Sequence, residues 1–287
     1  MTRYVLMVFA GACCFGILST FVKVAYQEGY ATADISGSQA CLGMLVLWAL
    51  YLLKKPATPA AQTTTAWWKV ALAGTSIGLC VHLYYLSVQW IPASVAIIFL
   101  MQFTWIGMLL EWCIFGKRPS RLQGCSILLI MAGTVMASGL CAQRNIILPL
   151  KGILLAAASA VIYGIYVVAS GRIGNDLPAL KKSALIMSGS TAAIFLVAMP
   201  GFLFHPEVLV SGLAKWTVFL ALFGTIIPPL LFSAGIPRTG VVLGAILMTA
   251  ELPVAVITAR LVLGEAISLL QWAGVAVMLL GITGGRK

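Results

Sequence analysis

Residues 241–263 read VVLGAILMTAELPVAVITARLVL, an apolar run long enough to cross a bilayer as one helix. Glu251 lies about midway along this run, where an ionised carboxylate is costly unless it is paired, protonated or hydrated. Pro253, two positions on, has no N–H to donate and clashes with the preceding turn, so we predict a kinked or opened backbone there. A carboxylate beside a helix break indicates a cavity, and we expect the rest of the chain to form its walls.

The composition is typical of an integral membrane protein built from helices. The chain has 287 residues, of which 61% are hydrophobic and 9% are charged, too apolar for a soluble domain of this length. Ten runs approach the roughly 20 apolar residues that a bilayer-spanning helix needs: residues 4–26, 34–53, 68–89, 92–115, 122–141, 152–171, 182–202, 216–235, 239–263 and 269–284. We therefore predict an all-α membrane protein with ten transmembrane helices.

The net charge of +11 follows from membrane topology, so we expect the lipid bilayer and no nucleic acid as a partner. With a cytoplasmic N-terminus, 13 of the 18 Lys and Arg residues fall on the cytoplasmic side. The positive-inside rule then predicts that both termini are cytoplasmic. The seven cysteines form no C-x-x-C pair and lie in or beside apolar runs, so we expect neither a metal site nor disulfides.

The sequence repeats itself with a shift of 148 residues. Phe15-Gly16-Ile17 falls on Tyr163-Gly164-Ile165, and the ends of the predicted helices coincide under the same shift. Five more identities follow: Gly116, Ser120, Leu122, Gln123 and Gly133 fall on Gly264, Ser268, Leu270, Gln271 and Gly281. Each repeat, residues 1–143 and 151–287, then holds five helices, and an odd number forces the second into the membrane upside down. Such inverted repeats place a substrate site near the bilayer midplane, and one half rocks against the other.

In the first half, four side chains are candidates for lining the site. His82 and Tyr85 share one face of the third predicted helix. Gln102 and Trp105 lie one turn apart in the fourth. A histidine in a membrane helix is also compatible with hydrogen-bonded packing, but its aromatic and amide neighbours favour a cavity wall.

In the second half, the candidates are Tyr163, Tyr166 and Thr225 together with Glu251. Both tyrosines lie deeper than the headgroup level that is usual for Tyr, so their hydroxyls should face protein or water. Thr225 precedes a tandem proline that should free backbone carbonyls, which are tolerated only beside protein or a wet cavity. The predicted hinges are the prolines of these two breaks: Pro228, Pro229 and Pro253.

Two roles for Glu251 are left open. Burial favours the neutral form of a carboxyl group, which makes this residue the candidate proton carrier for coupling. Alternatively, Glu251 stays neutral and bonds the backbone that Pro253 opens.

Three segments of the second half resemble, in order and spacing, the EamA family of the drug/metabolite transporter superfamily. They are Gly224-Thr225-Ile226-Ile227-Pro228 through Phe232, Glu251-x-Pro253, and Leu263-Gly264-Glu265. Two five-helix repeats are similar to that family's arrangement as well, so the resemblance covers the whole chain. It implies export of small molecules through the inner membrane, often amino acids or other metabolites, without ATP hydrolysis. The chain agrees on the last point, since it has no G-x-x-x-x-G-K-[ST] motif.

We therefore expect a secondary inner-membrane transporter that exports amino acids or similar small amphipathic metabolites by alternating access, as a monomer or weak homodimer without a cofactor. The alternatives are multidrug-type efflux of lipophilic compounds, a channel or a membrane scaffold. A channel should show rings of charge or a carbonyl filter motif, and this chain has neither. An enzyme is disfavoured because the two His and seven acidic residues form no catalytic cluster in the sequence.

Overall fold

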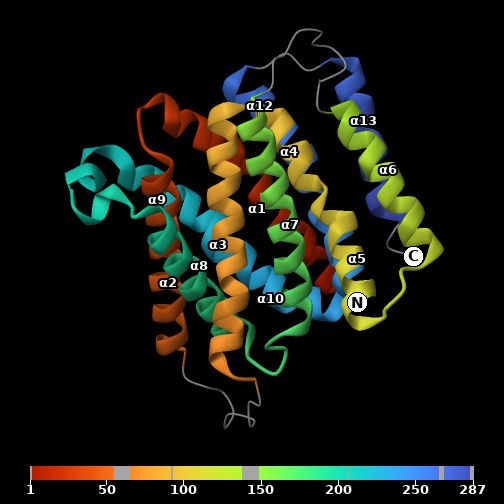
Figure 1. Cartoon of the computed structure of the whole chain (residues 1–287), viewed down its shortest axis with the longest axis horizontal. Helices are drawn as coiled ribbons and strands as arrows, with labels where there is room; N and C mark the ends of the chain where they lie inside the picture. Colours follow the sequence, from red (N-terminus) through yellow and green to blue (C-terminus); the bar gives the residue numbers. More distant parts are fainter. Residues whose placement is uncertain are drawn as a thin grey trace.

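The computed structural model describes residues 2–54, 65–91, 93–137, 149–205, 207–264 and 268–284, and these residues form helices and no strands. Within these described ranges, eight helical spans are long and apolar enough to cross a membrane, and two shorter apolar helices accompany them. Large apolar side chains such as Leu52, Leu196 and Leu261 are exposed on the outer surface, where a bilayer would cover them. The all-helical membrane architecture predicted from the sequence is confirmed (Figure 1).

The first half contains five apolar units, the fourth of which is broken into α4 and α5. Its helices are α1 (Thr2–Gln27), α2 (Thr32–Leu53), α3 (Trp67–Trp90), α4 (Ala93–Met101), α5 (Phe103–Phe115) and α6 (Arg121–Ala137). The fifth predicted run, residues 122–141, is helical to Ala137, and its last four residues lie outside the described part of the chain.

The second half also has five apolar units, and its third and fourth are interrupted. Its elements are α7 (Leu150–Arg172), α8 (Ala179–Ala198), η2 (Gly201–Leu203), η3 (Leu209–Leu213), α9 (Ala214–Leu220), η4 (Ala221–Ile226), α10 (Ile227–Thr239), α11 (Val241–Met248), α12 (Glu251–Leu263) and α13 (Leu269–Gly284). The eighth span is longer than the predicted residues 216–235, because α10 continues to Thr239 across the interior proline Pro237.

The 148-residue shift found in the sequence also relates the starts and ends of equivalent helices. α7 begins 148 residues after α1, α13 begins 148 residues after α6, and α12 begins 148 residues after α5. Gly116 and Gly264 end equivalent helices with φ of 65° and 67°, a left-handed conformation that glycine adopts without strain. These positions explain why the identities in the sequence are concentrated at helix ends.

The same register holds for the caps of α6 and α13. The Ser120 hydroxyl accepts a hydrogen bond from the backbone N–H of Gln123 at 3.2 Å. The side-chain oxygen of Gln123 accepts one from the backbone N–H of Ser120 at 3.0 Å. Ser268 and Gln271 make the same two bonds at 3.3 and 2.8 Å. Each pair satisfies two amides that a helix start would otherwise leave without an acceptor.

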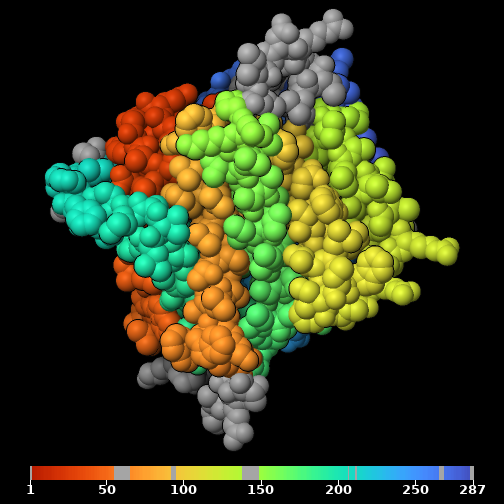
Figure 2. Space-filling model, viewed as in Figure 1, coloured from red at the N-terminus to blue at the C-terminus, as the bar shows by residue number. Residues whose placement is uncertain are grey.

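Helix contacts are also paired under exchange of the two halves. α1 packs on α10 and α12, and the equivalent α7 packs on α3 and α5. α2 packs on its own counterpart α8, and α6 packs on its counterpart α13. Figure 2 shows α3, α7 and α5 side by side on one face, so helices of both halves alternate across the molecule. The two repeats therefore interleave, and residues of both form the larger hydrophobic core cluster.

Glycines allow the closest of these crossings. A Cβ at Gly74 would meet the Ile186 carbonyl of α8, and one at Gly78 would lie 2.5 Å from the Ser190 carbonyl oxygen. The small residues of Gly74-x-x-x-Gly78 thus let the backbones of α3 and α8 touch. Where α6 crosses α13, a Cβ at Gly133 would likewise lie 2.7 Å from the Gly274 carbonyl oxygen.

Candidate functional site

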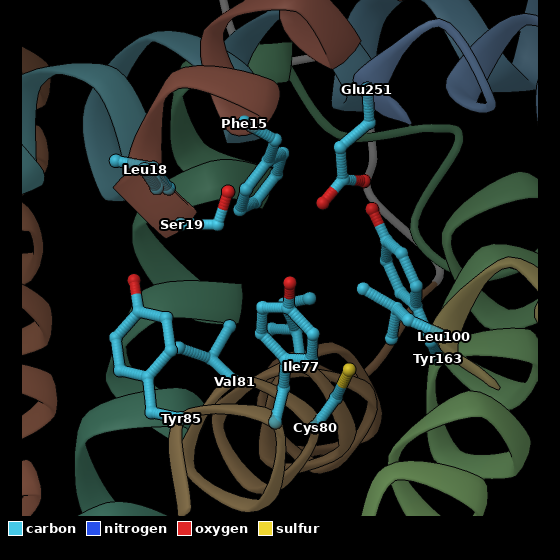
Figure 3. A pocket seen from close by; sticks show the side chains of 11 residues that line it. Phe15, Leu18, Ser19, Ile77, Cys80, Val81, Tyr85, Leu100, Tyr163 and Glu251 are labelled. Carbon is cyan, nitrogen blue, oxygen red and sulfur yellow. The ribbon is translucent and has the colours of Figure 1, made fainter. Parts of the chain in front are cut away.

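One candidate site is a cavity of about 360 Å³ between the two halves. Its walls come from α1, α3 and α4 of the first half and from α7 and α12 of the second. The lining residues are Phe15, Leu18, Ser19, Ile77, Cys80, Val81, Tyr84, Tyr85, Leu100, Tyr163 and Glu251. Figure 3 shows the Glu251 carboxylate directed into the space beside Phe15, with the Tyr163 hydroxyl directed toward it. We call this space the acidic cavity.

A second cavity of about 350 Å³ shares Phe15, Ile77 and Val81 with the first, so the two adjoin. Its other walls are Gln39, Ala40, Tyr166, Met187, Ser190, Ile194, Gly224, Thr225 and Pro229. These residues come from α2, α7, α8, η4 and α10, again from both halves. Neither lining contains a Lys, Arg or His.

Glu251 reaches the acidic cavity because its helix is broken directly before it. The Leu252 amide donates to the Thr249 carbonyl at 3.1 Å, the acceptor that an α-helical residue 253 would use. Pro253 cannot use it because it has no N–H. The Thr249 hydroxyl donates to the Ile246 carbonyl at 2.7 Å. The predicted break at Pro253 is therefore present, and side-chain and backbone donors satisfy these two carbonyls.

An equivalent break occurs in the first half, where the sequence has no proline. α4 ends at Met101, and the Gln102 side chain donates to the Ile98 carbonyl at 3.0 Å. Ile98 lies 148 residues before Ile246, so equivalent carbonyls receive a side-chain donor in both halves. Trp105 donates in turn to the Gln102 side-chain oxygen at 2.7 Å and fixes it in place.

Burial leaves one oxygen of the Glu251 carboxyl group unsatisfied within the described part of the chain. Its residue is 6% exposed, and Oε2 has no hydrogen-bond partner among the described residues. The hydroxyl of Tyr84, another lining residue, is also buried and without a partner in the described part of the chain. Buried polar atoms are normally satisfied, so two unsatisfied ones on residues that line the same cavity indicate a ligand or solvent site.

The tandem proline produces the second irregular segment. Pro228 and Pro229 open α10, and the turn before them is the π-helix η4. Thr225 donates to the Gln39 carbonyl of α2 at 2.8 Å and to the Ala221 carbonyl at 3.1 Å. A freed region of backbone is thus tied to a helix of the other half, beside the second cavity.

The structure brings five of the predicted site residues to the cavities. Tyr85, Tyr163 and Glu251 line the acidic cavity, and Tyr166 and Thr225 line the second. The hydroxyl of Tyr85 lies 3.4 Å from the Gln39 side-chain nitrogen, which joins the two groups.

Three predicted residues lie outside both linings. The buried ring of His82 is bonded through Nδ1 to the Ser36 hydroxyl of α2 at 3.0 Å. Gln102 and Trp105 are occupied at the break described above. In each case a hydrogen bond to a neighbouring group accounts for the polar atom.

Phe15, Tyr84 and Cys80 were not predicted as site residues. Phe15 stacks on Phe232 with ring centroids 5.7 Å apart, and Tyr163 packs on Phe103 at 4.5 Å. Phe15 and Tyr163 are equivalent under the 148-residue shift, so the repeat would have identified Phe15. Tyr84 and Cys80 gave no such signal, because an aromatic ring or a thiol in an apolar helix is as compatible with packing.

An ion pair joins the halves away from the cavities. Buried Glu111 of α5 pairs with Arg172 of α7, whose side chain is 35% exposed. The guanidinium also lies 4.6 Å from the centroid of the Phe115 ring. A loop carboxylate, Glu28, accepts hydrogen bonds from Trp216 at 2.7 Å and Lys215 at 2.9 Å, and these bonds lower its pKa.

Comparison with known proteins gives three findings. The family model of the EamA-like transporter family matches two segments of the chain, residues 2–139 and 150–284. The uncharacterized transporter YcbK of Bacillus subtilis (strain 168) is 25% identical over 281 residues, which cover 96% of this chain and 89% of the relative. A protein of known crystal structure has a TM-score of 0.73 and 21% identity, with 97% of each chain covered. The last likeness shows a shared fold.

Proposed function

Because the chain belongs to the EamA-like transporter family, we propose that this multi-pass membrane transporter is a secondary transporter that exports small amphipathic metabolites through the inner membrane. Its termini are cytoplasmic in this proposal, and it acts as a monomer or weak homodimer. The repeats, residues 1–143 and 151–287, have opposite orientations in the membrane, and alternating access results from rocking of one against the other.

The observation that carries the proposal is the acidic cavity between the halves. Helices of both repeats form its walls, so relative motion of the repeats would change its access. Aromatic rings and hydroxyls around one carboxylate suit a solute with an apolar part and a polar end, such as an amino acid or a related metabolite. Helix contacts made by the first half have counterparts made by the second half. This symmetry supports a cycle of two conformations in which each half takes the arrangement of the other.

We assign contact with the solute to Tyr85, Tyr163 and Glu251 in the acidic cavity, and to Tyr166 and Thr225 in the second. The remaining three predicted residues, His82, Gln102 and Trp105, hold the surrounding helices in position.

The hinges in this proposal are the breaks at Pro228, Pro229 and Pro253, where the regular backbone hydrogen bonding of the helix is already interrupted. Gln102 marks the equivalent break of the first half. Motion at these points costs fewer backbone hydrogen bonds than motion inside a regular helix.

Counterflow in proteoliposomes tests the transport function. We expect vesicles preloaded with a transported solute to accumulate labelled external solute transiently and saturably. A channel would show no counterflow, and a scaffold would show no flux. Multidrug-type efflux would appear as movement of lipophilic cations in the same vesicles, and failure to move any amphipathic solute would contradict the proposal.

Proton coupling through Glu251 is tested by Glu251→Gln, which keeps the side-chain shape but cannot exchange a proton. We expect uptake driven by a pH gradient to disappear, whereas counterflow at high solute concentration, which needs no proton exchange, should stay measurable although the lost contact at Glu251 weakens it. The exposed carboxylate Glu207 provides the matched control, and Glu207→Gln should behave as the unmodified protein. Gradient-driven uptake that Glu251→Gln leaves unchanged would exclude the carrier role.

A further inference from the structure

The acidic cavity contains one acid and no base. Glu251 is the only ionisable carboxylate among its lining residues, and the lining of the adjoining cavity adds none. A solute that carries both an ammonium and a carboxylate would find a partner for the first and none for the second. Burying a carboxylate without a partner is strongly unfavourable.

Two basic groups elsewhere in the structure, Lys182 and Arg172, already have partners. Lys182 is 1% exposed, and its ammonium donates to the Ser170 carbonyl at 2.6 Å and to the Asn175 side-chain oxygen at 3.0 Å. Arg172 is paired with Glu111. Neither basic side chain lines either cavity.

The start of α12, which adjoins the cavity, has no spare donor at three of its positions. A helix N-terminus binds anions when its first amides are free. Here Leu252 donates to the Thr249 carbonyl at 3.1 Å, Val254 donates to the Ala250 carbonyl at 3.4 Å, and Pro253 has no N–H. The break therefore presents a carboxylate to the cavity, and three of the first four residues of α12 offer no free amide to an anion.

The remaining walls suit an organic cation. Phe15, Tyr84 and Tyr163 place aromatic rings around the carboxylate, and aromatic faces attract ammonium groups. Leu18, Ile77, Val81 and Leu100 provide an apolar surface for the rest of a ligand.

We propose that the cargo of the acidic cavity is an organic monoamine, with its ammonium on Glu251 and its apolar part against the rings, and without a carboxylate of its own. The Tyr84 hydroxyl, buried without a partner in the described chain, accepts a second ammonium hydrogen. This inference rests on the proposed transport function and narrows its amphipathic solutes to those derived from amino acids by loss of the carboxylate, or similar to them.

Binding of four ligands with one ring and different charges tests the inference. The full-length protein in detergent micelles at neutral pH is titrated with 2-phenylethylamine, L-phenylalanine, 3-phenylpropionate and 2-phenylethanol, and heat release is measured. We expect the amine to bind at least about tenfold more tightly than the zwitterion, since a charge-assisted hydrogen bond is gained and no buried carboxylate is added. The anion should show no binding. Equal affinity for the amine and L-phenylalanine, or absence of amine binding, would overturn the proposal.

Variants at Glu251 connect this selectivity with the carboxylate. Glu251→Gln should weaken amine binding by roughly 10- to 100-fold and leave affinity for the alcohol unchanged. Glu251→Asp, which retains the charge, should keep a preference for the amine. Amine binding that survives Glu251→Gln at full strength would refute the assignment.

Counterflow separates failure of this inference from failure of the transport proposal. Vesicles that exchange L-phenylalanine but not 2-phenylethylamine would keep the transporter and overturn the monoamine. Vesicles that exchange the amine and not the zwitterion would support both. Absence of counterflow with every amphipathic solute would contradict the transport function itself.

Discussion

Removal of Arg172 should destabilise the protein by isolating the Glu111 carboxylate. Glu111 is 1% exposed, and its charge is compensated by a guanidinium that is itself 35% exposed. Loss of one partner of a fully buried pair costs about 3–5 kcal/mol, and water near this partner reduces the loss, so we expect about 2–3 kcal/mol for Arg172→Met. Replacement of both residues, in Glu111→Leu/Arg172→Met, should restore most of that stability because no charge stays buried.

Lysine is the matched control at this position. Arg172→Lys keeps the positive charge but loses the planar fork and the contact with the Phe115 ring. We expect it to lose about 1 kcal/mol, less than the methionine variant.

Reversible unfolding in mixed micelles of increasing dodecyl sulfate content, followed by tryptophan fluorescence, measures these free energies. The chain has eight tryptophans to report on unfolding. The argument depends on the double variant being more stable than Arg172→Met. If the two variants lose the same free energy, the cost comes from packing around Arg172 and the buried carboxylate has no part in it.

Three further predictions concern the repeat and the loops. Gly16→Ala should destabilise the protein by about 1–3 kcal/mol because the new Cβ would overlap a backbone carbonyl of α12. At the equivalent Gly164, the nearest atoms to a new Cβ lie at 3.1 and 3.3 Å, so Gly164→Ala should cost less. Titration with dodecyl sulfate would measure both losses. Ser120→Ala and Ser268→Ala should each cost about 1 kcal/mol in the same assay because each removes one helix cap, and clearly unequal losses would contradict their equivalence. The pKa of Glu28 is lowered in the folded protein from its ordinary value of 4.5. Its contribution to folding stability is therefore present above about pH 4.5 and is lost as pH falls through the lower pKa of the folded state. The thermal unfolding temperature of Glu28→Gln should differ from that of the unmodified protein at pH 6 and converge with it in stronger acid.

The sequence was sufficient for the helices, since bilayer-length apolar runs are readable without tertiary information. The break before Glu251 was also predictable because Pro253 removes a specific donor. The equivalent break at Gln102 was not predicted, because its cause is a side-chain amide that takes the Ile98 carbonyl, a contact that no local pattern indicates.

Placement of the site residues was only partly predictable, because helical spacing shows which residues share a face and not which neighbour that face meets. His82 and Tyr85 share a face as predicted, yet His82 bonds Ser36 of α2 whereas Tyr85 lines the acidic cavity. Tyr84, one residue before, lines the cavity as well. The difference arises from how α2 and α3 cross, which tertiary packing determines.

The two halves are alike in backbone and unlike in chemistry. Under the 148-residue shift, Arg172 corresponds to Val24 and Glu111 corresponds to Ala259, so one end of the molecule has a charged clasp where the other has two aliphatic side chains. Two exactly equal halves would give a carrier that faces either side of the membrane with the same probability. In the alternating-access cycle that we propose, divergence at a few positions would instead set a resting direction, and the free energy of this one ion pair would be a bias that each cycle has to overcome.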